Sequence, residues 1–215
     1  NGYAGFPISE ETLLQDILDA INAAADDQRI KLLVLSLADM GSSGLDQLQV
    51  IGRRLESFKK SGKKVIAIDD EYNQSQYYLA SFADEVLLNP MGGVHLRGFG
   101  VFGLYLQELI DRLAINFHVF KVGAFKSAVE PFTRSSMSDE DRQANQLWLA
   151  NLWNFFCADI ARNRKIDQAA INDLINNMPE HLRRAAGSTG KMALANGLVD
   201  GLKTRPEVRD YLINL

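Results

Sequence analysis

Short apolar runs alternate with amphipathic segments along most of the chain. Residues 31–37 (KLLVLSL) and 63–69 (KKVIAID) each contain an apolar stretch that offers both strand faces for burial. Strands buried on both faces are typical of parallel sheets that helices cover. The alternation of such strands with helices predicts an α/β protein with a largely parallel sheet.

Apolar residues at helical spacing predict the helices between these strands. The first helix is expected at residues 9–26, with Ser9 as its N-cap. The longest is expected at residues 139–164, capped by Ser138. Its apolar stripe is expected to pack rather than to form an aromatic binding patch, and comprises Leu147, Trp148, Leu152, Phe155 and Phe156. The other expected elements are helices at 45–60, 77–84, 103–113, 167–177, 189–196 and 206–213 and strands at 85–89 and 115–120.

Composition and charge narrow the class of protein. A length of 215 residues fits a single domain over residues 1–215 with a sizeable core. The net charge of −4 argues against a nucleic-acid partner. The one cysteine, Cys157, excludes an internal disulfide, and its apolar surroundings predict a buried side chain. No run approaches the roughly 18 apolar residues of a membrane span, and neither a span nor a signal peptide is expected within this sequence.

Lys126 is the strongest candidate for a catalytic residue. It lies in the stretch 118–139 (HVFKVGAFKSAVEPFTRSSMSD), where Gly123 allows a turn. Pro131 is expected to hold Glu130 in an extended conformation. A lysine in an ordered apolar turn is desolvated, which favours the neutral amine and allows it to act as a general base. A solvated surface charge is the alternative, because most lysines are exposed.

Three segments resemble motifs of the signal peptide peptidase A (protease IV) family. Members of this family are membrane-associated serine proteases with a Ser/Lys dyad. Residues 123–132 (GAFKSAVEPF) resemble the family's lysine motif. Residues 77–90 (YYLASFADEVLLNP) resemble the segment after its nucleophile, and residues 189–202 (TGKMALANGLVDGL) resemble its closing motif. The resemblance implies a Clp-protease/crotonase-like superhelix of stacked ββα units, with Lys126 as the catalytic general base.

The nucleophile of the family has no counterpart here. The family carries a serine in an A-S-G-G-Y-Y context, whereas this segment reads NQSQYY and Gln74 holds the serine's place. An amide cannot attack an acyl carbon, and Ser75 is shifted by one residue, which re-aims its side chain. The loop 38–44 (ADMGSSG) also lacks the S-P-G-G of the family's oxyanion loop. This combination resembles the N-terminal domain of the double-length form, whose first domain provides the lysine and whose second provides the serine.

The resemblance also implies partners and a location. Cleaved signal peptides are the expected substrate, and the C-terminal domain of the same protein and further copies in a homo-oligomer are the expected partners. Membrane attachment is expected through a segment outside these residues, with the catalytic part on the periplasmic side of the inner membrane. No cofactor is expected. Because signal peptides are apolar, we expect a groove lined by Phe99, Phe125 and Phe132.

Two alternatives remain open. The first is a non-catalytic scaffold half that builds the oligomer and guides peptide. The second is an acyl-CoA-handling crotonase relative, in which the lysine motif would have no role.

The other polar candidates are expected to be structural. Asp69, Asp70 and Glu71 are expected to be solvated loop charges, with acid/base catalysis by paired carboxylates as the alternative. Ser127 could orient Lys126 or cap the next turn. The histidines lack the spacing of a metal site, and His118 is expected in the core. They are His95, His118 and His181.

Overall fold

The structure, a computed structural model, describes residues 12–41, 43–116, 118 and 127–215. The chain divides into two compact units. Unit 1 combines Asn1–Arg97 with Asp159–Leu215, and unit 2 is Gly98–Ala158. The assignment of residues 1–215 to a single domain stays a prediction.

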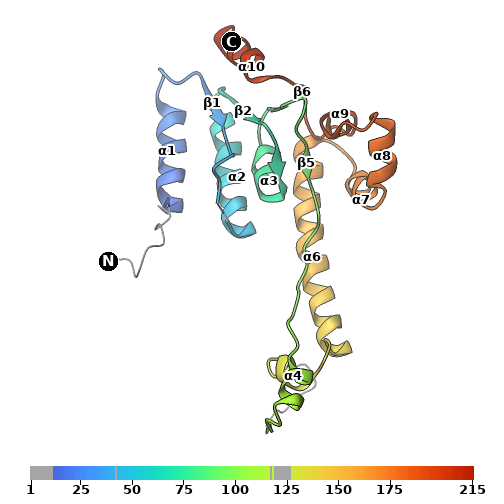
Figure 1. The fold of residues 1–215 in the computed structure, drawn as a ribbon. Coiled ribbons are helices and arrows are strands. Elements are labelled where there is room, and N and C mark those ends of the chain that lie inside the picture. The colour runs from blue at the N-terminus through green and yellow to red at the C-terminus, as the bar shows by residue number, and fades with distance from the viewer. Residues whose placement is uncertain (1–11, 42, 117, 119–126) are drawn as a thin grey trace. The chain divides into compact units, whose positions relative to one another are not determined.

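Unit 1 is built on a parallel sheet with the strand order β1-β2-β4-β6 (Figure 1). All three strand pairings in it are parallel, and β3 and β5 form a second, two-stranded parallel sheet. The predicted α/β class with a largely parallel sheet is therefore confirmed. Central strands β2 and β4 supply buried residues such as Ile66 and Val86. The strands are β1 (Leu32–Leu35), β2 (Lys64–Asp69), β3 (Tyr72–Asn73), β4 (Glu85–Leu88), β5 (Val94–His95) and β6 (Gly201–Leu202).

Helices α1 (Leu14–Asp26), α2 (Leu45–Lys59) and α3 (Gln74–Ala80) lie side by side along this sheet (Figure 1). Helix α2 packs closely enough that a Cβ on Gly52 would come within 2.5 Å of the Phe82 ring. A glycine is therefore required at this crossing, because a larger side chain would push the helix away from the ring.

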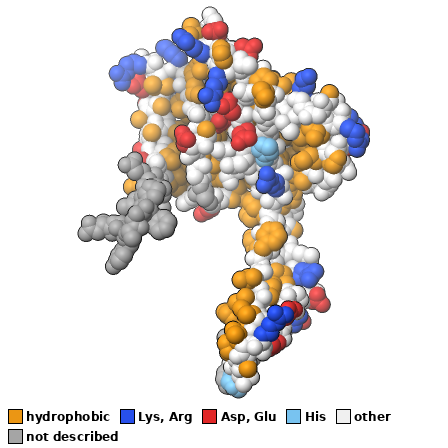
Figure 2. Space-filling view, in the orientation of Figure 1, with side chains coloured by type: hydrophobic (Ala, Val, Ile, Leu, Met, Phe, Trp, Pro, Cys, Tyr) orange, Lys and Arg blue, Asp and Glu red, His pale blue; other side chains and the backbone are white. Residues whose placement is uncertain are grey.

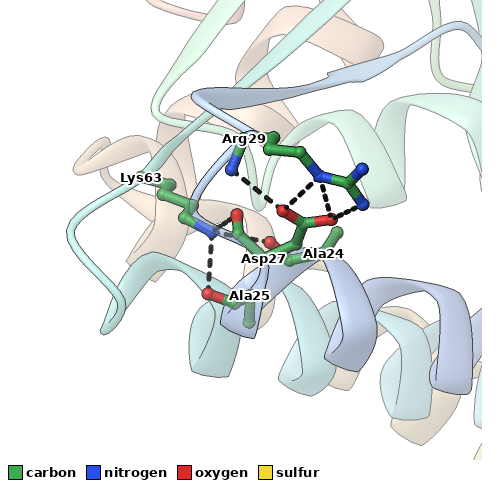
Figure 3. A network of polar contacts seen from close by, with 5 residues as sticks. All are labelled: Ala24, Ala25, Asp27, Arg29 and Lys63. Atoms are coloured by element: carbon green, nitrogen blue, oxygen red, sulfur yellow. Dashed lines mark hydrogen bonds and ion pairs between the residues drawn. The ribbon is translucent and has the colours of Figure 1, made fainter.

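Lys63 fixes the C-terminal end of α1 (Figure 3). Its ammonium donates hydrogen bonds to the backbone carbonyl oxygens of Ala24, Ala25 and Asp27, at 2.7, 2.8 and 2.7 Å. The last carbonyls of a helix have no partner within the helix, and a cation there also complements the helix dipole. The helix begins at Leu14, later than predicted, and the expected cap Ser9 lies outside the described residues.

The C-terminal part of unit 1 is helical, as expected, with one helix more than predicted. The helix expected at 167–177 ends at Asn176, and a separate helix begins at Met178. Pro179 in the first turn of this second helix explains the break, because proline lacks the N–H that would continue the first helix. The helices are α7 (Gln168–Asn176), α8 (Met178–Arg184), α9 (Thr189–Ala195) and α10 (Arg205–Ile213).

Unit 2 contains α4 (Gln107–Arg112), α5 (Glu130–Thr133) and most of α6 (Asp139–Arg164). The predicted range of α6 is confirmed, and the Ser138 hydroxyl accepts a hydrogen bond from the Asp141 N–H as the expected N-cap. Helix α4 is shorter than predicted. Of the strand expected at 115–120, residues 115, 116 and 118 lie in no strand, and the others are outside the described residues.

Two predicted burials in unit 2 are wrong. His118 is exposed rather than part of the core. In the apolar stripe of α6 Phe156 is buried, but the side chains of Leu147 and Phe155 are 68 % and 65 % exposed, and that of Trp148 is exposed as well. Helical periodicity identifies an apolar stripe, but it does not say whether the same chain supplies a partner for it.

The conformation predicted for Glu130 is also wrong. It is the first residue of α5 instead of an extended residue. Pro131 occupies the first turn of this helix, where its missing N–H is not needed. The disfavoured backbone conformation before a proline is tolerated here because the Glu130 carboxylate is buried and hydrogen-bonded.

Candidate functional site

The lysine motif is described only on its C-terminal side. Lys126 and Phe125 lie outside the described residues, so the catalytic role of Lys126 stays a prediction. Ser127 is half-buried, and its backbone carbonyl accepts a hydrogen bond from the Glu130 N–H at 2.9 Å. This bond closes a turn that leads directly from the lysine into α5.

The buried Glu130 carboxylate ties this turn to the start of α6. One oxygen accepts a hydrogen bond from the Ser138 hydroxyl at 2.6 Å, and the other accepts from the Ser138 N–H at 3.0 Å. Both residues are buried. A buried carboxylate needs such donors to offset its lost hydration, so this contact fixes the geometry immediately after the lysine.

At the place of the family's nucleophile, the chain forms a reciprocal helix cap. The Asn73 side-chain oxygen accepts a hydrogen bond from the Gln76 N–H at 3.0 Å, and the Gln76 side-chain oxygen accepts from the Asn73 N–H at 2.8 Å. This capping box starts α3 at Gln74, three residues earlier than predicted.

The amide side chain of Gln74 has a structural partner of its own. Its oxygen accepts a hydrogen bond from the Arg97 N–H at 2.9 Å, which links α3 to the chain after β5. Ser75 is the second residue of α3 and is half-buried. Gln74, which was expected to stand at the place of the family's nucleophile, therefore connects two backbone segments in this chain.

The buried Gln76 side chain joins α3 to the loop after β1. Its amide nitrogen donates hydrogen bonds to the backbone carbonyl oxygens of Leu37 at 2.7 Å and Ala38 at 3.4 Å. The Leu37 carbonyl also accepts from the Met40 N–H at 3.0 Å, which makes residues 37–40 a tight turn. The loop that was expected to match the family's oxyanion loop is thus held by a side chain here.

Asp69, at the end of β2, is not the solvated loop charge that we expected. One carboxylate oxygen accepts a hydrogen bond from the Leu37 N–H at 2.8 Å, and the other accepts from the Asp70 N–H at 3.0 Å. Burial raises the pKa of Asp69, while hydrogen bonds from the backbone of Leu37, Asp70 and Ala38 act in the opposite direction.

The neighbouring carboxylates have separate partners at the surface. Asp70 pairs with Arg205, whose hydrogen bond holds the pKa of that carboxyl below its usual range. A Glu71 oxygen lies 3.5 Å from the His95 ring nitrogen. The separated partners of Asp69, Asp70 and Glu71 do not support acid/base catalysis by a carboxylate pair.

Asp69, Asp70 and Glu71 line a cavity of about 620 Å³ in unit 1. It opens at the carboxyl ends of β1, β2 and β4, which is where ligands bind in open α/β sheets. Three carboxylates and three basic groups contribute to its wall. The charged and amide side chains lining it are Asp69, Asp70, Glu71, Asn73, Gln76, His95, Lys203 and Arg205. Among the described residues, no group of three or more His, Cys, Asp or Glu side chains could hold a metal ion.

Two tyrosines that follow Gln74 are part of the packed core in the segment 77–90. Tyr77 and Tyr78 are buried, and the Tyr77 hydroxyl donates a hydrogen bond to the Leu198 carbonyl at 2.7 Å. The Tyr78 hydroxyl donates to Asp159 at the end of α6. Burial raises the pKa of both phenols, so they remain neutral donors. Cys157 is buried, as predicted, and its burial raises the thiol pKa to about 12.

Sequence reasoning missed Arg164 and the role of Asp69. The Arg164 guanidinium is buried and donates to both oxygens of Asp200, at 2.8 and 2.9 Å. A carboxylate at the end of an apolar strand was the available signal for Asp69. The sequence did not indicate that Arg164 is buried, because it lies in the last turn of α6. Basic residues are common in that turn, where their charge complements the helix dipole.

The chain belongs to a family of peptidases: residues 57–214 match the profile of Peptidase family S49, so it is a member of that family. It is also similar to Protease 4 of Salmonella typhi, with 39 % identity over 203 residues, which cover 94 % of this chain and 33 % of that protein. Protease 4 of Haemophilus influenzae is 42 % identical over 190 residues, covering 88 % of this chain and 31 % of that protein. The chain thus spans about a third of the length of these relatives, and the predicted family is confirmed.

A comparison with solved structures gives a weaker likeness. An enoyl-CoA hydratase/isomerase family protein from Silicibacter pomeroyi is 16 % identical, with a TM-score of 0.33 over 93 % of this chain and 87 % of that protein. A TM-score this low is not an argument for a shared activity.

Proposed function

We propose that this chain is a half-site domain of a membrane-associated Ser/Lys-dyad protease that degrades cleaved signal peptides. Lys126 is the general base, and the nucleophilic serine comes from a second domain of the same protein. The observation that carries the proposal is the hydrogen bond between Gln74 and Arg97, which gives the nucleophile's place a structural role while the lysine motif is kept.

The chemistry divides between the two domains. Lys126 takes the proton from the serine hydroxyl as it attacks the peptide carbonyl, and then returns it to the leaving amine. A lysine with an ordinary pKa, about 10.4, is protonated at neutral pH and cannot accept that proton. Desolvation on assembly with the second domain lowers its pKa toward the working range.

The exposed apolar surface of unit 2 supports assembly and a peptide-binding role. Hydrophobic side chains gather on this unit (Figure 2). Large exposed apolar patches mark interaction sites, because water wets them at a free-energy cost. We define the unit 2 apolar surface by Val101, Phe102, Leu104, Leu109, Leu113, Ile115, Phe132, Leu147, Trp148 and Phe155.

Of the groove residues expected from the sequence, Phe132 belongs to the unit 2 apolar surface. Phe99 instead packs against Trp153 and Phe156, with ring centroids 6.0 and 5.7 Å apart. We therefore assign Phe132 to the peptide groove and Phe99 to internal packing. Phe125 lies outside the described residues.

The proposal includes further copies of the chain in a homo-oligomer and a location on the periplasmic side of the inner membrane. Among the described residues, no helix combines the length and the apolar character that crossing a bilayer requires. Attachment through another segment of the protein is the arrangement that we propose.

The test uses the intact protein with a signal peptide as substrate. Lys126→Ala and Lys126→Arg should both abolish turnover, because a guanidinium stays charged and cannot act as a base. Lys191→Arg, at an exposed lysine of α9, is the matched control and should keep full activity. Substantial turnover by the Lys126→Arg protein would overturn the assignment.

A second measurement locates the nucleophile. A serine-reactive phosphonate should label the second domain of the intact protein and leave Ser75 unlabelled. Labelling should persist in Ser75→Ala. A phosphonate adduct on Ser75 would contradict the division of the site between two domains.

The unit 2 apolar surface also suits a scaffold half that only builds the oligomer and guides peptide. The two functions differ in one result. In a scaffold, Lys126→Arg keeps turnover, whereas substitutions in the apolar surface reduce it.

A further inference from the structure

A backbone segment and a carboxylate of this chain form a pair that resembles a bound anion and its site. The Leu37 N–H donates a hydrogen bond to Asp69 at 2.8 Å, and the neighbouring Ala38 backbone also favours the charged carboxylate. Successive N–H groups directed at one point make an anion-binding concavity. Here the anion is a side chain of the same chain.

The Ala38 N–H is fixed in direction from the other side, because it shares a peptide plane with the Leu37 carbonyl that Gln76 holds. The Gln76 amide holds the carbonyl oxygens of Leu37 and Ala38, and the capping box with Asn73 holds the Gln76 side chain in turn. Removing the Asp69 carboxylate would therefore leave N–H groups that already point to where an oxygen lies. Preorganised donors of this kind bind a negatively charged oxygen without a reorganisation cost.

The site faces free volume. Asp69, Ala38 and Gln76 all line the cavity of about 620 Å³, and Lys203 and Arg205 also contribute to its wall. A volume in this range accommodates a small organic ligand. The Asp69 side chain thus accepts a hydrogen bond from the Leu37 N–H and also lines the cavity.

We propose that Asp69 fills, from within the chain, a carboxylate-binding site formed by the backbone N–H groups of Leu37 and Ala38, and that small carboxylates enter this site when the side chain is removed. In the native chain the Asp69 side chain excludes the carbonyl oxygen of an acyl substrate from this site by its volume. This half of the protein is therefore closed to acyl chemistry independently of which residue stands at the nucleophile's place.

Chemical rescue tests the proposal in the intact protein. In Asp69→Ala, backbone hydrogen exchange at Leu37 and Ala38 should accelerate by about tenfold, the effect of losing one hydrogen bond of average strength. Sodium acetate should slow this exchange again in a saturable manner, whereas sodium chloride at equal ionic strength should not. The readout is mass spectrometry of a peptide that covers residues 36–40.

Asp84→Ala is the matched control. The Asp84 carboxylate also accepts a backbone hydrogen bond, from the Val65 N–H at 2.8 Å, but Asp84 does not line the cavity. Exchange at Val65 should accelerate in this variant without rescue by acetate. In Asp69→Asn, the amide oxygen still fills the site, so exchange at residues 36–40 should not respond to acetate.

Three results would overturn the proposal: unchanged exchange in Asp69→Ala, equal effects of acetate and chloride on that variant, or an equal acetate response in Asp69→Asn. If Asp69→Ala does not fold in chloride, its folded yield in acetate becomes the readout, and an equal yield in both salts would also refute the site. None of these results depends on Lys126, so they stand apart from the test of the proposed function.

Discussion

The Tyr77 hydroxyl donates a hydrogen bond to the backbone carbonyl of Leu198 at 2.7 Å, and thereby joins two segments that are 121 residues apart. Tyr77 follows the nucleophile's place, and Leu198 lies in the closing segment before β6. Both side chains are buried. The two segments that resemble family motifs each supply one side of the same packed junction.

Removing this hydroxyl should destabilise unit 1. Tyr77→Phe leaves a buried carbonyl without its donor, so we expect the free energy of unfolding to fall by about 1–3 kcal/mol. Urea denaturation measures the change. Tyr211→Phe is the control, because its hydroxyl contacts Glu85 in a less buried place, and it should cost less. Equal losses in the two variants would contradict the role of the junction.

The buried Arg164 should not tolerate lysine. Its guanidinium donates to both oxygens of Asp200 and to the Gly197 carbonyl at 3.3 Å, an arrangement that a single ammonium cannot reproduce. We expect Arg164→Lys to lower the free energy of unfolding by about 1–3 kcal/mol. Arg162→Lys, at an exposed position of the same helix, should change it by less than about 0.5 kcal/mol. A larger effect at Arg162 than at Arg164 would refute this reading.

Self-association should depend on the unit 2 apolar surface. Phe102 is 98 % exposed, and its burial in an oligomer would contribute about 1.5–3 kcal/mol. We therefore expect Phe102→Ser to weaken self-association by roughly 10–100-fold, measured by light scattering over a concentration series. Met91→Ser, at a 95 % exposed position of unit 1, is the control and should leave association unchanged. A strictly monomeric native protein at high concentration would exclude this role of the surface.

The stability contributed by Asp69 should increase toward acid pH. Burial raises its pKa, so the folded state takes up a proton at a higher pH than the unfolded chain does. The contribution is full below the unfolded value near 3.8 and is lost as the pH rises through the raised folded pKa. The free energy of unfolding of the native protein, relative to Asp69→Asn, should therefore rise as the pH falls from 7 toward 4. A difference that stays constant or falls over this interval would contradict the raised pKa.

The sequence by itself determined the elements whose signals are local. The apolar runs at 31–37, 63–69 and 85–89 became the parallel strands β1, β2 and β4, and the range of α6 with its cap Ser138 was predicted correctly. Strand burial and helix capping depend on residues that are neighbours in the chain, so their periodicity and spacing are visible in the sequence. The family could also be predicted, because its motifs are continuous segments.

Only the tertiary structure decided what the polar residues of the candidate site do. Asp69 meets Leu37 from 32 residues away, and Gln76 meets Leu37 from 39 residues away. No local pattern encodes such partners, so Asp69 was expected to be solvated and Gln76 was not recognised as a contact to the oxyanion loop. The same reason applies to the apolar stripe of α6: its periodicity is local, whereas the burial of Phe156 and the exposure of Leu147 depend on what the folded chain places against them.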